Sequence, residues 1–163
     1  MEVKKIYLGY PQYYSMLFEF LRRKYEKEVT AWGIYPKPKF VHGIPRGGVA
    51  IALHLSHALG LEYVEKFADI LYTHRDGVIY TLTEEDKKYL LVVDDVSDTG
   101  KTFLEFFECM NHKRFLTFTL YVKPHTKYFP TMYCEETSDW IVFPWEKVDE
   151  KPNREMYEHL GGE

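Results

Sequence analysis

The sequence has few cysteines, no excess of basic residues and no long apolar run. Its two cysteines, Cys109 and Cys134, are too far apart for a CxxC redox or metal motif, so we expect a reducing compartment. No segment approaches the roughly 20 apolar residues of a transmembrane helix, and the N-terminus lacks the apolar core of a signal peptide. We therefore expect a cytoplasmic protein without a membrane partner.

The charge balance is slightly acidic. The chain has 21 Lys and Arg against 25 Asp and Glu, a formal charge of −4, which argues against nucleic acid as a partner bound through bulk electrostatics. A net charge of −4 is still compatible with a local site that binds a small anion. Because 45% of the residues are apolar and 17% are aromatic, the 163 residues can build a hydrophobic core. We predict a single domain over residues 1–163.

Apolar periodicity predicts alternating helices and strands. Apolar residues at three- and four-residue steps predict an amphipathic helix from about Tyr10 to Trp32. Beyond it, the predicted strands are 39–43, 61–67, 89–94, 115–122 and 140–143, and the predicted helices are 47–59 and 101–110. Continuous apolar strands that alternate with helices are typical of an α/β fold, in which helices cover both faces of a parallel sheet.

Two segments fall outside this alternation. Asp76-Gly77 is a two-residue turn signal within residues 69–82, and it predicts a β-hairpin that leaves the main sheet. The C-terminal tail, residues 147–163, carries helix start and stop signals over 152–160. The tail contains no pattern that indicates chemistry.

The segment Leu90–Thr102, LLVVDDVSDTGKT, carries the most chemical information, because it predicts a strand, a polar turn and a helix start. Backbone N–H groups at a helix start can bind phosphate. The carboxylates of Asp94 and Asp95, expected to be solvated at the strand end, can bind sugar hydroxyls or Mg²⁺. The alternative is an ordinary connection capped by Asp98 or Thr99. A Walker P-loop is disfavoured, because it needs glycine where Asp95 stands.

A second turn, Ile44-Pro45-Arg46-Gly47-Gly48, also follows a predicted strand and opens a predicted helix. Flexible glycine backbone, exposed N–H groups and a guanidinium would meet where a pyrophosphate could bind. The alternative is a glycine turn with a surface arginine. In the segment Leu90–Thr102, a ribose 5-phosphate would satisfy both the acid pair and the phosphate turn.

Four ordered segments resemble the type I phosphoribosyltransferases. VHGIPRGGVAIA (41–52) resembles their pyrophosphate loop and LLVVDDVSDTGKT their ribose-phosphate motif, while TLYVKP (119–124) and WIVFPWE (140–146) are similar to segments of the hypoxanthine, guanine and xanthine–guanine members. The resemblance implies an open, mostly parallel twisted sheet flanked by helices, with a small hairpin lid or hood. It implies Mg²⁺-dependent transfer of the phosphoribosyl group from phosphoribosyl pyrophosphate (PRPP) to N9 of a 6-oxopurine, which yields a nucleoside monophosphate and pyrophosphate.

The resemblance also assigns roles to the two phosphate turns. The residues that it implies for the ribose and 5′-phosphate are Asp94, Asp95, Asp98, Thr99, Gly100, Lys101 and Thr102. Among these, Asp94 and Asp95 would bind the ribose hydroxyls and help to hold Mg²⁺, and Asp98 would be the catalytic acid/base at purine N7. Arg46 and Gly47 would bind the pyrophosphate.

Three further residues are implied to bind the purine. Lys123 would donate to O6, and a donor-only ammonium favours a carbonyl over the amino group of adenine. Trp140 would stack on the base, and the backbone of Ile141 would meet the purine edge. Without the resemblance, Lys123 reads as a surface lysine and Trp140 as a core residue. Val142 stands where the xanthine–guanine enzymes carry an acidic residue, which weakens the case for xanthine and for a metal contact there.

The hairpin at 69–82 falls where the family places a mobile loop over the active site. Tyr72, His74 and Arg75 are the candidate closing residues, and the alternative is an ordinary solvated hairpin. His54 and His57 lie three residues apart on a predicted helix without a carboxylate partner, so we expect packing or surface roles and not a metal site.

Two other functions stay open. One is a regulator that binds PRPP without turnover, although the N-terminal helix segment is too short for the nucleic-acid-binding domain that such a protein would carry. The other is a phosphoribosyltransferase for a different base. The family also suggests a homodimer or a larger homo-oligomer.

Overall fold

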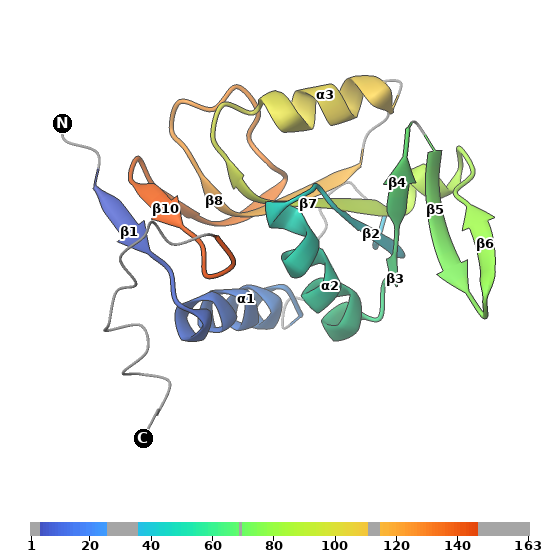
Figure 1. The fold of residues 1–163 in the computed structure, drawn as a ribbon, viewed down its shortest axis with the longest axis horizontal. Helices are drawn as coiled ribbons and strands as arrows, with labels where there is room; N and C mark the ends of the chain where they lie inside the picture. Colours follow the sequence, from blue (N-terminus) through green and yellow to red (C-terminus); the bar gives the residue numbers. More distant parts are fainter. Residues whose placement is uncertain (1–3, 26–35, 69, 111–114, 147–163) are drawn as a thin grey trace.

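The computed structural model describes residues 4–25, 36–68, 70–110 and 115–146, and a parallel β-sheet lies at its centre (Figure 1). Its five strands are, in spatial order, β3 (Glu62–Tyr63), β2 (Phe40–Gly43), β7 (Leu90–Ser97), β8 (Leu116–Val122) and β9 (Met132–Glu136). Every neighbouring pair is parallel. The carboxyl ends of the strands therefore meet at one edge of the sheet, where α/β folds bind ligands.

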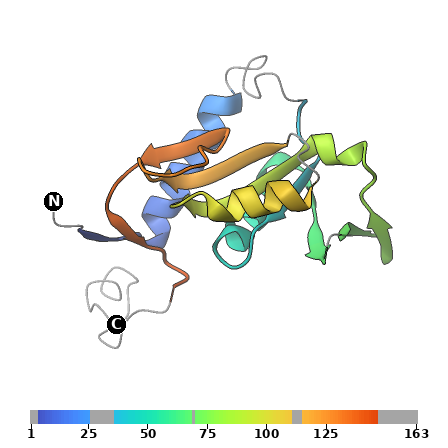
Figure 2. The same ribbon diagram turned by 90° about the horizontal axis from the view of Figure 1, so that it is seen from above.

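Helices cover both faces of this sheet. α1 (Tyr10–Tyr25) and α2 (Gly47–Leu59) lie on one face and α3 (Lys101–Cys109) lies on the other (Figures 1 and 2). Leu91 and Val93 of β7 belong to the hydrophobic core under α1 and α2, whereas Leu90 and Val92 belong to the core under α3. Both faces of the strand are buried, which explains its continuous apolar run. The α/β prediction is confirmed.

Two small sheets flank the central one, at opposite ends of the view in Figure 1. β4 (Glu65–Phe67), β5 (Ile70–Arg75) and β6 (Val78–Thr81) form an antiparallel sheet that contains the predicted hairpin. β1 (Lys5–Tyr7) pairs in parallel with β10 (Trp140–Val142). A 3₁₀ turn, η1 (Asp86–Tyr89), leads from the hairpin sheet into β7.

The structure corrects several predicted boundaries. The strand predicted at 61–67 is divided into β3 and β4, which belong to different sheets, and β7 continues to Ser97, three residues beyond its predicted end. The strand predicted at 140–143 pairs with β1 and not with the central sheet. β1 and β9 were missed, because β1 has three residues and the edge strand β9 is mostly exposed and lacks an apolar run.

Other predicted elements lie partly outside the described residues. α1 is described as far as Tyr25, so the end predicted near Trp32 falls in residues 26–35, and the helix predicted at 152–160 falls in residues 147–163. Within the described ranges, none of the helices has the length and apolar composition that crossing a lipid bilayer requires.

Candidate active site

The turn between β7 and α3 forms a small cavity at the carboxyl edge of the sheet. The cavity measures about 240 Å³ and is lined by Asp94, Asp95, Val96, Ser97, Asp98, Thr99, Gly100, Thr102 and Phe103. The predicted ribose and phosphate residues therefore come together, with the exception of Lys101. The Lys101 ammonium lies 3.5 Å from the carboxylate of Glu105 on the exposed surface of α3.

Gly100 gives this turn its shape. Its φ of +81° lies in the left-handed region that favours glycine, and α3 begins at the next residue. A β-carbon at Gly100 would lie 2.5 Å from the backbone nitrogen of Tyr128 and 2.9 Å from Oγ1 of Thr126. The turn after β7 is therefore packed tightly against the loop after β8.

The two adjacent carboxylates lie within β7, near its carboxyl end, and they are half-buried and not solvated as the sequence suggested. Burial raises the pKa of Asp94, and the neighbouring charge of Asp95 raises it further. Burial also raises the pKa of Asp95, with a smaller contribution from the carboxylate of Glu146. The carboxylates of Asp94, Asp95 and Glu146 repel one another, and a cation bound beside them would relieve this repulsion.

The pair can hold part of the coordination shell of a divalent cation. Oδ1 of Asp94 accepts a hydrogen bond from the backbone N–H of Asp95 at 2.9 Å, and Oδ1 of Asp95 accepts one from Val96 at 2.7 Å. Across the described ranges, no group of three or more His, Cys, Asp or Glu side chains is arranged as a metal site. The donor set therefore fits a Mg²⁺ ion that takes its remaining ligands from phosphate and water.

The second predicted turn, residues 44–48, lies directly beside this pair. The backbone N–H of Ile44 donates to the carbonyl of Val93 at 2.8 Å, and the Pro45–Arg46 peptide bond is cis. Gly47 is so close to Asp95 that a β-carbon would overlap the carboxylate. Arg46 is exposed at the start of α2. The structure thus places both predicted phosphate turns against one another at the same edge.

Lys123 connects the cavity to the segment that contains Trp140. It is only 6% exposed, so it is not a surface lysine, and its ammonium donates to the backbone carbonyl of Asp139. Its backbone N–H donates to the carbonyl of Ser97 at 3.0 Å. Trp140 is 53% exposed at the start of β10, and Ile141 is buried. The three predicted purine residues therefore lie on segments joined through Lys123.

The three candidate lid residues contact acidic side chains of β3, in the central sheet, and of β4, in the hairpin sheet. The hydroxyl of Tyr72 donates to Glu65 at 3.2 Å, and His74 lies 3.6 Å from the same carboxylate. Arg75 forms an ion pair with Glu62. The hairpin turn itself is confirmed, because Asp76 and Gly77 both have positive φ. Closure of the hairpin over the site stays a prediction.

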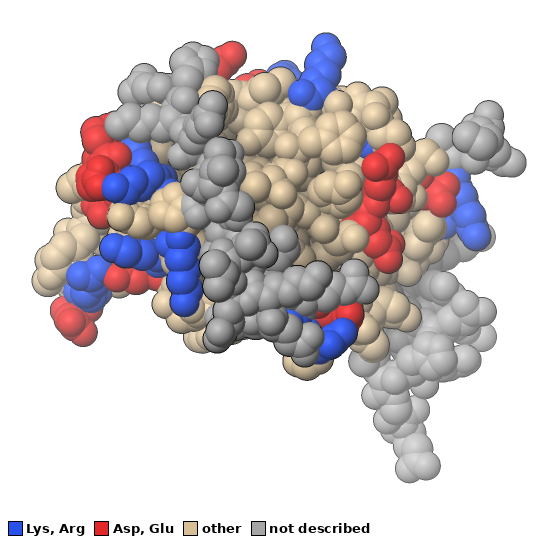
Figure 3. Space-filling view, turned by 180° about the vertical axis from the view of Figure 1, so that it is seen from behind, with Lys and Arg blue, Asp and Glu red and all other residues tan. Residues whose placement is uncertain are grey.

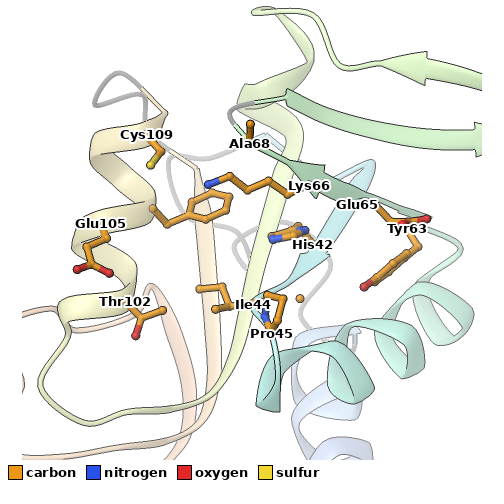
Figure 4. Close-up of a pocket in the computed structure, with 12 residues that line it drawn as sticks. His42, Ile44, Pro45, Tyr63, Glu65, Lys66, Ala68, Thr102, Glu105 and Cys109 are labelled. Atoms are coloured by element: carbon orange, nitrogen blue, oxygen red, sulfur yellow. The ribbon is translucent and has the colours of Figure 1, made fainter.

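A larger cavity of about 530 Å³ lies between α3, β2 and β4 (Figure 4). It is lined by His42, Gly43, Ile44, Pro45, Tyr63, Glu65, Lys66, Ala68, Thr102, Glu105, Phe106 and Cys109. Thr102 also lines the smaller cavity, so the two adjoin at the start of α3. The Lys66 ammonium lies 4.9 Å from the centre of the Phe106 ring. This cavity leaves open space beside the turn at residues 44–48, on the side of the hairpin sheet.

Sequence reasoning missed His125. Its Nε2 lies 2.9 Å from Oδ1 of Asp98, the predicted catalytic residue. The available signal was its position in a polar segment directly after an apolar strand, where parallel strands bring their carboxyl ends together. The expectation of a packing role is confirmed for His54, whose Nδ1 is hydrogen-bonded to the hydroxyl of Tyr13 at 2.5 Å, and His57 is exposed.

The surface charges agree with the acidic composition. On the face shown in Figure 3, described basic and acidic side chains lie next to one another and much of the centre is uncharged. The described residues include the ion pairs of Lys87 with Glu84 and of Lys88 with Glu85.

The chain belongs to the family of phosphoribosyl transferase domains, whose family model matches residues 17–150. A solved purine phosphoribosyltransferase from Pyrococcus horikoshii Ot3 is 29% identical, with 92% of this chain and 99% of that chain covered and a TM-score of 0.64. The xanthine-guanine-hypoxanthine phosphoribosyltransferase of Helicobacter pylori is 20% identical, with 87% and 93% covered and a TM-score of 0.60.

More distant structures share the fold. The hypoxanthine phosphoribosyltransferase of Trypanosoma cruzi in complex with IMP is 15% identical, with 83% of this chain and 77% of that chain covered and a TM-score of 0.54. The central parallel sheet with helices on both faces, together with a separate antiparallel sheet, is therefore the type I phosphoribosyltransferase fold.

Proposed function

We propose that this protein is a Mg²⁺-dependent purine phosphoribosyltransferase that joins N9 of a 6-oxopurine to C1 of PRPP and releases pyrophosphate. The observation that carries the proposal is the contact between the two phosphate turns, in which Gly47 packs against the acid pair beside the cavity of the β7–α3 turn. The 29% identity to a purine phosphoribosyltransferase over 92% of the chain supports the same activity.

The sugar phosphate would bind to the β7–α3 turn. Backbone N–H groups at the start of α3, with the hydroxyls of Thr99 and Thr102, would hold the 5′-phosphate, because a helix N-terminus attracts anions. Asp94 and Asp95 would accept hydrogen bonds from the ribose hydroxyls and provide two ligands for Mg²⁺. Bound there, the ion would neutralise the phosphate charge of the substrate. Binding would then need little basic surface, consistent with the net charge of −4.

The leaving pyrophosphate and the base would occupy opposite sides of the ribose. Arg46 and the backbone of Gly47 would hold the pyrophosphate, and the hairpin sheet would exclude water from the cationic sugar. On the base side, Lys123 would donate to O6 while Trp140 stacks on the ring and Ile141 offers its backbone. Asp98 would take the proton that the purine loses when N9 bonds to C1.

Hypoxanthine and guanine are the proposed bases, and xanthine is less favoured. An ammonium at Lys123 matches a carbonyl at C6 and leaves the amino group of adenine without an acceptor, which costs binding energy. Val142 offers no charged side chain for the second carbonyl of xanthine. We expect the chain to act in the cytoplasm.

The assay combines the protein, PRPP and Mg²⁺ with each of hypoxanthine, guanine, xanthine, adenine and uracil. We expect IMP and GMP as products. Nucleotide from adenine or uracil alone would overturn the choice of base. No nucleotide from any base would overturn the activity, and PRPP binding in that case would indicate a regulator.

We also propose that the enzyme acts as a homodimer or a larger homo-oligomer. Tyr10, Tyr14 and Phe18 follow one another at four-residue steps on α1 and are 47%, 49% and 68% exposed. An exposed aromatic strip of this kind is typical of an interaction surface. Sedimentation equilibrium that gives the mass of a single 19.5 kDa chain at micromolar concentration would contradict this assembly.

A further inference from the structure

We propose that His125 is a positioning residue that orients the carboxylate of Asp98 for proton transfer to and from the purine. This inference rests on the proposed function and adds a residue to it. Nε2 of His125 lies 2.9 Å from Oδ1 of Asp98, and the two residues follow β8 and β7, which are neighbouring strands of the sheet.

A surface contact between these two side chains would mean little by itself. The side chain of His125 is 63% exposed and that of Asp98 is 47% exposed, and exposed pairs of this kind contribute little to stability. The contact between His125 and Asp98 has a role because hydrogen bonds hold the two loops that carry these residues in place. We infer that the contact orients the carboxylate of Asp98 and adds little to folding stability.

Four hydrogen bonds fix the two loops to one another. The backbone N–H of Lys123 donates to the carbonyl of Ser97 at 3.0 Å, and that of Lys127 donates to the carbonyl of Thr99 at 3.0 Å. Between these bonds, the buried hydroxyl of Ser97 lies 3.0 Å from Oγ1 of Thr126 and donates to the carbonyl of Tyr128 at 2.8 Å. His125 therefore sits between two anchored residues, opposite Asp98.

This arrangement assigns different tasks to the two oxygens of Asp98. Nε2–H of His125 donates to Oδ1 and holds the plane of the carboxylate, while Oδ2 remains available to the base. When N9 bonds to C1, the electron pair of the C1–O bond leaves with pyrophosphate, and the purine proton passes to Oδ2. The proton then leaves Asp98 to water. In this scheme His125 neither gains nor loses a proton. It contacts the acid/base group Asp98 and not the substrate.

The test compares His125→Ala with His125→Gln, whose side-chain amide nitrogen can donate from nearly the same position. We expect His125→Ala to lower kcat about tenfold, a fraction of what general acid/base catalysis contributes, with the KM for PRPP changed less than about twofold. His125→Gln should keep kcat within about threefold of the parent protein. His57→Ala, at an exposed histidine of α2, is the matched control and should be neutral.

A double-mutant cycle separates orientation from other effects. In an Asp98→Asn background, His125→Ala should produce no further loss, because the carboxylate that it orients is gone. Three outcomes would overturn this inference but not the proposed function. They are an equal loss of kcat in both backgrounds, a His125→Ala variant with full kcat, and a His125→Gln variant as impaired as His125→Ala. A parent protein that forms no nucleotide with any base would instead overturn the proposed function, and this inference with it.

Discussion

Gly47 and Asp95 belong to different turns and pack directly against one another. A β-carbon at position 47 would overlap the carboxylate of Asp95, so only glycine allows the two turns their present separation. Gly47 opens α2 after β2, and Asp95 lies at the carboxyl end of β7. The contact therefore fixes the distance between the proposed pyrophosphate and ribose subsites.

Gly47→Ala should lower kcat/KM at least tenfold, since the added methyl group must push the two turns apart and small displacements of bound groups are costly in catalysis, on the order of 10²-fold per ångström. Steady-state kinetics with PRPP and hypoxanthine would measure the loss. Gly9→Ala is the matched control, because the one close contact of the added carbon there is with the flexible end of the Gln12 side chain, and Pro11 lies at ordinary van der Waals distance. A Gly47→Ala enzyme with parental kinetics would contradict the subsite arrangement.

Asp94→Asn should stabilise the protein in the absence of Mg²⁺ and PRPP while it lowers turnover. Burial and the neighbouring Asp95 raise the pKa of Asp94, so the folded protein binds this proton more tightly than the unfolded chain does. The contribution of Asp94 to stability is therefore present in acid and is lost as the pH rises. The stabilising effect of the substitution should grow between pH 5 and pH 8, to about 1 kcal/mol.

Urea unfolding at several pH values measures this effect, with Asp86→Asn as the control. Asp86 accepts hydrogen bonds from the backbone and hydroxyl of Thr83, which lower its pKa, so its replacement should destabilise the protein at neutral pH. A destabilised Asp94→Asn protein at pH 8 would show that the acid pair is already compensated without the ion.

His42 should make the protein less stable in acid. It is 3% exposed on β2, and its Nδ1 lies 2.8 Å from the carbonyl of Val64, which it satisfies as a donor. Burial lowers the pKa of His42, with a smaller effect of the Lys66 charge, so the unfolded chain takes up a proton below about pH 6.5 that the folded protein resists. The contribution of His42 to the free energy of unfolding should therefore fall between pH 7 and pH 5.

His42→Asn keeps a side-chain donor and removes the titrating ring. Urea unfolding at pH 7 and pH 5 should show that acid affects the free energy of unfolding less unfavourably in this variant than in the parent protein. His57→Asn, the same substitution at an exposed histidine of α2, provides the comparison. Parallel pH profiles for His42→Asn and the parent protein would exclude His42 as the source of the acid sensitivity.

The sequence was most informative where local pattern and chemistry coincide. The apolar run of β7, the acids at its end and the glycine before α3 lie within thirteen residues, so their order alone predicted a strand, a turn and a helix start. The structure confirms these elements, and it gathers the predicted residues of the turn around one cavity. The same holds for β2, the turn at 44–48 and α2.

Contacts between distant segments could not be predicted in this way. The pairing of β1 with β10 joins segments 135 residues apart along the chain, as in Lys5 opposite Trp140. The pair formed by His125 and Asp98 depends on the register between β7 and β8, which sequence periodicity does not specify. The burial of Asp94 and Asp95 was also missed, because the segment that covers them, the turn at 44–48 after β2, is distant in the sequence.

Lys123→Met should impair use of the base more than binding of PRPP, because it removes the ammonium proposed to meet O6 without shortening the side chain. We expect kcat/KM for hypoxanthine to fall at least tenfold, about the value of a lost hydrogen bond to a charged donor. The carbonyl of Asp139 also loses its donor, so the free energy of unfolding should fall by about 1 kcal/mol. Lys88→Met, at an exposed lysine paired with Glu85, should change neither quantity. A Lys123→Met enzyme with parental kcat/KM for hypoxanthine and reduced stability would mean that Lys123 serves only to hold Asp139 and the start of β10.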